Sequence, residues 1–396
     1  MPKERTEFEI ARQKRRRRLF LQRFGRLIAA GAAAAALIFG IYKAIDIDLI
    51  GILSDRAAAV STSGTGLPIE FAGNTVRGAF ECNGNIGLLT DTAYYLYGTN
   101  GSQLLYEQHG MTNPAVCASG RRFLIYDRGG TKLIVRTRDS VLFEQEFPYT
   151  IIDASLSKGG WLTVVTGAQR YSSQVTVYSP EYKEAAFTWE ASGEYVLSAC
   201  VGPDNRSIAA AAVGASGGEM YTTLHIFAVD APEELARQKF EGSTVLDVCF
   251  SGTGDIKIIC DDLAAMVAKN GTLLGEYKYS GTLYAYSSTR DEAPAVLIFD
   301  KYKELRSCET VFLGDKCEVL ADATVGGLVN GAVSNDSTVA IYTPNGISVF
   351  DDSGMLKEVS SDSSEALKLL LIGNDIYAVG RSELFAPKFE KVPVEK

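Results

Sequence analysis

The stretch ISVFDDSGMLKEV, residues Ile347–Val359, joins two short apolar segments through a polar turn. The same order of apolar segment, turn and apolar segment occurs in AAMVAKNGTLLGEY, residues Ala264–Tyr277. The turns hold Asn-Gly, Asp-Ser or Ser-Gly at equivalent places, and such pairs favour β-hairpins. Further copies lie at Tyr94–Gln108, Leu133–Phe147, Val175–Trp189 and, with a longer turn, Leu224–Phe240. This recurrence predicts an all-β fold built from repeats.

A second pair of apolar strands precedes each hairpin, so each repeat holds four predicted strands. The repeats begin near Val76, Ala115, Ile151, Tyr195, Thr244, Leu283, Leu328 and Leu367, at spacings of 39, 36, 44, 49, 39, 45 and 39 residues. A period near forty residues with four strands per repeat is typical of a β-propeller. One or two β-sandwiches are the alternative, but they do not explain hairpins at a fixed offset. Eight starts predict eight blades, and the degenerate copies leave seven as the alternative.

The last repeat is incomplete, because LKLLLIG, DIYAVG and ELFAP supply three strands and little follows them. The segment PIEFAG, Pro68–Gly73, precedes the first repeat and can supply the missing outer strand. Pairing of the two ends would close the ring and remove exposed sheet edges. We therefore predict a propeller domain over residues 67–391 that is closed by its N- and C-terminal strands.

The strand–turn–strand units, such as ISVFDDSGMLKE and AAMVAKNGTLLGEY, resemble degenerate repeats of quinoprotein-like propellers, of the WD40 or PQQ kind. The resemblance covers roughly Leu67 to Lys391 and is one of pattern, since the copies lack the Ala, Asp, Gly and Trp positions of those repeats. Only Trp189 stands where such repeats often place tryptophan. Relatives in this class include dehydrogenases and non-enzymatic scaffolds for protein assembly, so the resemblance implies a fold and leaves the activity open.

An apolar segment, LIAAGAAAAALIFGIY, covers Leu27–Tyr42. As a helix it would extend about 24 Å, and Lys43 can snorkel to the headgroups and lengthen the span. Residues 1–26 carry ten Lys or Arg and three Glu, a net charge of +7. The positive-inside bias therefore predicts a basic cytoplasmic tail over residues 1–26 and an uncleaved signal anchor, a transmembrane helix, over residues 27–45. A cleaved signal peptide is the alternative.

Residues 46–66, which end in STSGTG, are predicted to form a juxtamembrane linker. Beyond the tail, the other 370 residues carry 29 basic and 45 acidic side chains, a net charge of −16. Such a domain repels phosphates, so we expect no nucleic-acid partner. With its basic leader and single span, the chain is similar to uncharacterised membrane-anchored propellers of Gram-positive bacteria. That resemblance implies a single-pass protein of the cell membrane with an extracytoplasmic propeller.

The sequence predicts no catalytic, cofactor-binding or metal-ligating residue. Its seven cysteines and two histidines form no CxxC motif and no Cys/His cluster. The segment GASGG, Gly214–Gly218, superficially resembles the nucleophile turn of a serine protease, and we interpret it as a hairpin loop. The segment SGTGD, Ser251–Asp255, lacks the third glycine and the helix of a phosphate loop. The pairs Asp261–Asp262 and Asp351–Asp352 lie in predicted turns, where the backbone conformation favours Asp. We therefore interpret them as turn residues rather than as calcium ligands.

Two sets of residues leave a choice between packing and function. Four cysteines fall in the first, innermost strand of their repeats: Cys82, Cys117, Cys200 and Cys249. They form either a ring of thiols along the channel or, as we favour, a repeated small buried apolar side chain. The abundant tyrosines include Tyr94, Tyr95, Tyr97, Tyr277, Tyr279, Tyr284 and Tyr286. We interpret most as packing residues, with sugar or peptide binding as the alternative for exposed ones.

These features favour a membrane-anchored extracytoplasmic propeller that acts as a non-enzymatic binding or scaffold module without a cofactor. The expected partner is an envelope protein or a cell-wall polymer, held by the loops of one face and the channel mouth. Two alternatives remain open: an envelope enzyme, either a quinoprotein-like oxidoreductase or a glycan hydrolase, and a sensor of an extracellular ligand. Adjacent cysteines, which such oxidoreductases usually carry, are absent from the sequence.

Overall fold

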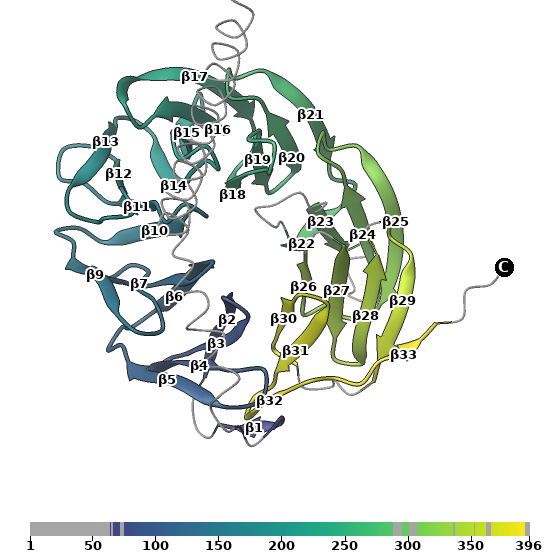
Figure 1. Cartoon of the computed structure of the whole chain (residues 1–396). Helices are drawn as coiled ribbons and strands as arrows, with labels where there is room; N and C mark the ends of the chain where they lie inside the picture. Colours follow the sequence, from purple (N-terminus) through teal and green to yellow (C-terminus); the bar gives the residue numbers. More distant parts are fainter. Residues whose placement is uncertain are drawn as a thin grey trace, which may run out of the picture. The chain divides into compact units, whose positions relative to one another are not determined.

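The computed structural model describes residues 64, 66–71, 75–287, 295–300, 307–335, 337–351, 353–361 and 366–392. The strands formed by these residues make eight sheets that are arranged as a ring of blades around a central channel (Figure 1). The predicted tail and signal anchor, and all of the predicted linker except Gly64 and Gly66, lie outside the described residues. None of the described residues forms a helix with the length and hydrophobicity that a membrane span requires.

The first four blades each consist of four consecutive antiparallel strands, counted from the channel outward. Blade 1 holds β2 (Val76–Cys82), β3 (Asn85–Thr90), β4 (Ala93–Tyr97) and β5 (Gln103–Gln108). Blade 2 holds β6 (Pro114–Ser119), β7 (Arg122–Asp127), β8 (Lys132–Arg136) and β9 (Val141–Glu146). Blade 3 holds β10 (Ile151–Leu156), β11 (Leu162–Thr166), β12 (Ser173–Tyr178) and β13 (Ala185–Ala191). Blade 4 holds β14 (Tyr195–Val201), β15 (Ser207–Ser216), β16 (Glu219–Ala228) and β17 (Ala231–Glu241).

The other four blades repeat this plan, with changes at the chain ends. Blade 5 holds β18 (Val245–Phe250), β19 (Ile256–Cys260), β20 (Leu263–Val267) and β21 (Leu273–Lys278). Blade 6 holds β22 (Thr282–Ser287), β23 (Ala295–Asp300), β24 (Ser307–Leu313) and β25 (Val319–Gly326). Blade 7 holds β26 (Gly331–Ser334), β27 (Thr338–Thr343), β28 (Gly346–Asp351), β29 (Leu356–Ser360) and β33 (Glu390–Lys391). Blade 8 holds β30 (Lys368–Ile372), β31 (Asp375–Val379), β32 (Glu383–Phe385) and β1 (Ile69–Glu70).

The prediction of an eight-bladed propeller is confirmed, and the seven-bladed alternative is wrong. Each inner strand starts within three residues of a predicted repeat start, the largest difference being that between Leu328 and Gly331. The hairpins that recur in the sequence are the third and fourth strands of their blades, as β28 and β29 illustrate. The polar turn pairs therefore mark the periphery of the ring rather than the channel.

The two ends of the chain meet in blade 8. Strand β1 pairs with β32, with Ile69 opposite Leu384, and it forms the outer edge of that blade. The Phe71 amide donates a hydrogen bond of 2.8 Å to the Ser382 carbonyl, which prolongs the pairing. A second join, which the sequence did not indicate, follows at the C-terminus: β33 adds a fifth strand to blade 7 by pairing with β29.

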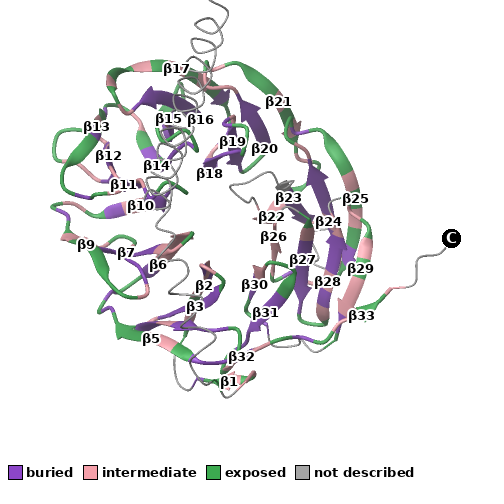
Figure 2. Ribbon diagram, viewed as in Figure 1, coloured by how far each residue is buried: buried purple, intermediate pink, exposed green. Residues whose placement is uncertain are grey.

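The hydrophobic core is divided into eight clusters, and each cluster lies between two neighbouring blades. Residues alternate along the inner three strands so that both faces of a blade are buried, whereas the outer strands show exposed positions (Figure 2). Strand β9, for example, alternates between exposed and half-buried residues. A blade thus has two apolar faces, and it can bury them only against its neighbours.

Substitution of the aromatic residue beside the closing strand tests the contribution of closure to stability. Phe71 is 6% exposed and packs in the cluster between blades 8 and 1. We expect Phe71→Ala to lower the free energy of unfolding by about 3 kcal/mol, because the cavity opens at the junction of the chain ends. Urea unfolding followed by circular dichroism measures the change. Tyr106→Ala, at a residue 46% exposed on β5, is the control, and an equal effect of both variants would contradict the prediction.

Candidate functional site

A repeated irregularity shapes the inner strands at one mouth of the channel. In β2, β10, β14, β18 and β22 the pairing register shifts by one residue near the start of the strand. The residues left without a Cα partner are Arg77, Ile152, Leu197, Leu246 and Tyr284. A β-bulge bends its strand and changes the direction of a side chain, and it is enriched next to functional sites. Blades 3 to 6 all carry a large apolar or aromatic residue in the bulge.

Four of these bulged residues, together with Tyr195 at the start of β14, give the mouth an apolar rim, defined as Ile152, Tyr195, Leu197, Leu246 and Tyr284. Leu246 is 46% exposed and Tyr284 is 45% exposed, while Ile152 is half-buried and packs against the cluster between blades 3 and 4. Tyr195, which starts β14, is 60% exposed. Single exposed apolar residues are common, but a set that recurs at one register position on successive blades forms a patch. Such patches mark interaction surfaces.

Polar side chains near this end of the inner strands connect blades 2, 3 and 4. Asp153 accepts a hydrogen bond of 3.0 Å from the Tyr126 hydroxyl and another of 3.0 Å from the Ser198 hydroxyl. The Arg128 guanidinium donates to the Tyr126 oxygen at 2.9 Å and lies 3.6 Å from the Asp153 carboxylate. One carboxylate thus ties three blades together at the mouth.

Tyr286 lies on β22 of blade 6 and packs against the hydrophobic cluster between blades 5 and 6. Burial raises the pKa of Tyr286, and the carboxylates of Asp247 and Asp153 raise it further, whereas Arg128 opposes the shift. We call Tyr126, Arg128, Asp153 and Ser198 the channel cluster.

The hairpin β15–β16 projects at the same end of the channel. Tyr195 pairs with Val213, and three further residue pairs carry the hairpin on to Ser216 and Glu219, about 10 Å beyond the start of β14. Gly217 and Gly218 have φ values of 65° and 91°, the left-handed conformations that a two-residue hairpin turn requires. The GASGG segment is therefore a hairpin turn, as its sequence suggested.

The protease alternative for this segment is wrong. His225 lies on the same hairpin opposite Ala210, six residue pairs from Ser216, which corresponds to about 20 Å. His109 is buried, its Nδ1 accepts the Met111 amide hydrogen bond at 2.9 Å, and its Nε2 lies 3.1 Å from the Thr90 carbonyl. Neither imidazole can serve Ser216 as a general base.

His225 instead belongs to a cluster between blades 3 and 4. Its Nδ1 lies 2.7 Å from Glu234 and its Nε2 lies 2.8 Å from Glu194. The Trp189 ring packs on the imidazole, with centroids 4.7 Å apart. Glu194 directly precedes Tyr195, so this cluster fixes the loop that presents part of the apolar rim. The sequence singled out Trp189 but gave no sign of its partners.

The four inner-strand cysteines are packing residues. Cys82 is 2% exposed and lies in the cluster between blades 1 and 2. Cys200 is 3% exposed and lies in the cluster between blades 4 and 5. Cys117 packs at the edge of the cluster between blades 2 and 3, and Cys249 is buried. The hypothesis of a thiol ring along the channel is therefore wrong for these residues.

Two of the remaining sequence candidates lie in turns, as predicted, whereas Asp351 is the last residue of β28. SGTGD joins β18 to β19, and Asp261–Asp262 joins β19 to β20. Although burial opposes the shift, hydrogen bonds from Ser353 and Lys357 lower the pKa of Asp351 to about 2, and Asp352 lies outside the described residues. Among the residues that the structure describes, no three His, Cys, Asp or Glu side chains are placed to hold a metal ion.

The tyrosines of the sequence divide as expected between core and surface. Tyr94 and Tyr97 are buried, and burial raises the pKa of Tyr97 to about 12. Tyr279 donates a hydrogen bond of 3.1 Å from its hydroxyl to the Cys260 carbonyl. Tyr284 is the exposed member of the set, and it lies on the apolar rim.

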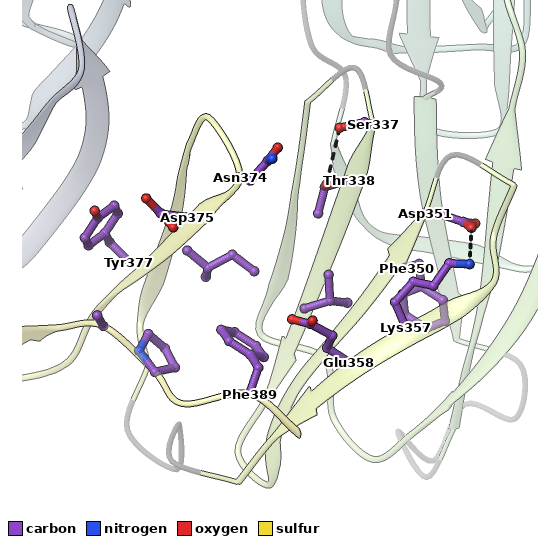
Figure 3. A pocket seen from close by; sticks show the side chains of 14 residues that line it. Ser337, Thr338, Phe350, Asp351, Lys357, Glu358, Asn374, Asp375, Tyr377 and Phe389 are labelled. Atoms are coloured by element: carbon purple, nitrogen blue, oxygen red, sulfur yellow. Dashed lines mark hydrogen bonds and ion pairs between the residues drawn. The ribbon is translucent and has the colours of Figure 1, made fainter. Parts of the chain in front are cut away.

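A pocket of about 560 Å³ lies between blades 7 and 8. Figure 3 shows Phe389 and Glu358 beside it, with Asn374 and Asp375 at its edge. Phe389 belongs to the segment that leads from β32 to β33, and it packs against the cluster between these blades. We interpret this pocket as space left where the C-terminal segment crosses from blade 8 to blade 7.

Comparison with protein-family models assigns the chain to a family. Residues 71–384 match the model described as a family of unknown function, DUF5711. The chain belongs to this family. A search of curated proteins found no match. The match covers every blade of this DUF5711 protein, and it supports the propeller part of the resemblance inferred from the sequence.

Solved structures share the fold of the DUF5711 chain at low sequence identity. Sqt1 of Saccharomyces cerevisiae is 10% identical with a TM-score of 0.58, covering 84% of this chain and 100% of that one. BamB from Moraxella catarrhalis is 10% identical with a TM-score of 0.53, covering 81% and 98%. The C-terminal WD40 domain of Sif2 is 12% identical with a TM-score of 0.59, covering 82% and 99%. These likenesses establish the fold alone.

Removal of the shared carboxylate tests the channel cluster of the DUF5711 protein. We expect Asp153→Ala to lower the free energy of unfolding by about 2 kcal/mol, because two buried hydroxyl donors lose their acceptor. The control Asp230→Ala removes an exposed ion pair with Arg206. It should change the free energy of unfolding by less than about 0.5 kcal/mol. Urea unfolding at neutral pH measures both. Similar losses in the two variants would show that the cluster does not tie the blades together.

The raised pKa of Tyr286 predicts a loss of stability in alkali. An unfolded tyrosine ionises near pH 10, whereas the folded state keeps this phenol protonated at higher pH. The free energy of unfolding should therefore fall as pH rises above about 10. In Tyr286→Phe the fall between about pH 9 and about pH 11 should be smaller than in the parent protein. Tyr284→Phe, at the exposed phenol of the same strand, is the control, and equal slopes in both variants would refute the prediction.

Proposed function

We propose that this protein is a membrane-anchored, extracytoplasmic propeller that acts as a non-enzymatic scaffold and binds an envelope protein at the channel mouth. The observation that carries the proposal is the apolar rim, which repeated bulges present on blades 3 to 6. A closed ring holds such a rim rigidly, because each inner strand is fixed by two neighbouring blades. Rigid supports with exposed variable positions suit partner recognition.

The proposed location rests on the N-terminal sequence. The apolar segment Leu27–Tyr42 follows a tail with a net charge of +7, and the other 370 residues carry a net charge of −16. The positive-inside bias would retain the tail in the cytoplasm and export the propeller. The channel mouth would then be available to proteins of the envelope.

Site-specific crosslinking in membranes tests the partner. A photo-crosslinking amino acid replaces Leu246 on the rim or, as the control, Leu235, which is 59% exposed on β17. We expect one envelope protein to be captured through position 246 of the full-length chain and not through position 235, because the rim is the proposed contact. Equal capture at both positions would contradict the assignment of the rim. Capture of no protein at position 246 would contradict the scaffold function.

Labelling of intact cells tests the location. Ser216→Cys places a thiol at the exposed tip of β15–β16, and Thr6→Cys places one in the basic tail. We expect a membrane-impermeant maleimide to label position 216 in intact cells and position 6 only after lysis, with the parent protein as background. The reverse pattern, or protection of both sites until lysis, would contradict an extracytoplasmic propeller.

A further inference from the structure

The chemistry of the channel mouth restricts which partner segment it can bind. We propose that the mouth binds a protein segment in which an Arg or Lys side chain is flanked by apolar side chains. This inference rests on the proposed function of the mouth as the partner site, and it adds the chemical class of the partner. Its parts are the apolar rim, the surrounding charge and the tyrosines that lie among them.

The apolar part of the surface has members on both blade 4 and blade 5. Strands β14 and β18 are in contact, and each carries a bulged leucine, Leu197 and Leu246. Met220, 48% exposed on the projecting hairpin, adds to this surface on blade 4. Burial of exposed leucine and methionine side chains against apolar side chains of a partner would supply the affinity.

Carboxylates outnumber cationic groups around this apolar surface. The acidic residues at this end of blades 4 and 5 are Glu194, Glu219, Glu241, Asp247, Asp261, Asp262 and Glu276, and the basic ones are Lys239 and Lys278. Both cations already have acidic neighbours. Lys239 lies 2.8 Å from the Glu241 carboxylate, and Lys278 lies 3.5 Å from the Glu276 carboxylate. The net charge at this end of blades 4 and 5 is negative, so a cationic segment is attracted there and an anionic one is repelled.

Tyrosine rings offer a specific place for the cationic side chain. Tyr195 and Tyr284 expose 60% and 45% of their surface on the rim. The protein itself uses the same chemistry nearby, since the Lys239 ammonium lies 3.7 Å from the centroid of the Tyr221 ring. That ring lies over Gly214, where a Cβ atom would come within 2.5 Å of it. A partner arginine or lysine can therefore pack on an exposed tyrosine while it faces the carboxylates.

Other occupants fit this surface less well. A wholly apolar segment would desolvate the carboxylates at this end of blades 4 and 5 without supplying a positive charge. A second copy of the chain would bring an identical set of carboxylates against the first. A bilayer with anionic headgroups would meet the same repulsion. Charge complementarity thus selects a basic segment of a partner protein.

Peptide binding to the full-length protein in detergent micelles tests the chemistry. The probe is a fluorescent peptide GSLRLSG, compared with peptides that hold Gln or Glu in place of Arg, by fluorescence anisotropy. We expect the Arg peptide to bind at least about tenfold more tightly than either. The double variant Leu197→Ala/Leu246→Ala should weaken its binding about tenfold, and Asp247→Asn should abolish the preference for Arg over Gln. Leu235→Ala, on the outer strand, is the matched control and should bind as the parent does.

Several results would overturn the inference. These are equal affinity for the Arg and Gln peptides, no binding of the Arg peptide, or an equal loss in Leu235→Ala. A dimer that Leu197→Ala/Leu246→Ala dissociates, or binding of anionic vesicles that this variant abolishes, would assign the rim to another occupant. Mass spectrometry of the segment captured through position 246 distinguishes a failure of this inference from a failure of the proposed scaffold function. A captured segment without Arg or Lys refutes the inference alone, whereas the absence of any captured protein refutes the proposed function.

Discussion

All eight hydrophobic clusters lie between blades, and this single constraint governs the rest of the structure. A four-stranded blade with two apolar faces is not stable alone, so each blade depends on both neighbours and the ring must close. The ring is closed by the short strand β1, which pairs with β32 of blade 8, and by Phe71, which packs between blades 8 and 1. The second join through β33 ties blade 8 to blade 7 with the C-terminal segment.

The ring was predictable because its determinants are local and repeated. Turn pairs such as Asn270–Gly271 and Ser353–Gly354 occur at the same place in four of the eight repeats, and their spacing reflects the number of strands per blade. The segment around Ile69 could be assigned because the last repeat lacked one strand. Strand β33 escaped prediction because two residues, Glu390 and Lys391, carry no alternation of apolar and polar side chains.

The candidate site was only partly predictable. A side chain in a bulge is exposed although its neighbours are buried, and composition alone does not distinguish Leu246 from the buried Val245 and Val248. The sequence does hold a trace of the pattern, since IID, VLS and VLD begin three successive inner strands. This pattern does not identify a bulge by itself, because the position of a bulge depends on how the inner strand pairs with the strand beside it. Likewise, the contacts of His225 join residues from three strands or loops that no spacing links.

Closure and recognition place opposite demands on the inner strands. Regular pairing would direct every large side chain into the clusters between blades and leave the channel lined by backbone and small residues. A bulge releases one residue per strand from that alternation while the rest of the strand keeps its register, as Val248 and Ile258 do beyond Leu246. Asp153 then restores the cohesion of three blades with hydrogen bonds where apolar packing has been interrupted. The rim is therefore exposed where the channel cluster holds the strands in place, and the two features depend on each other.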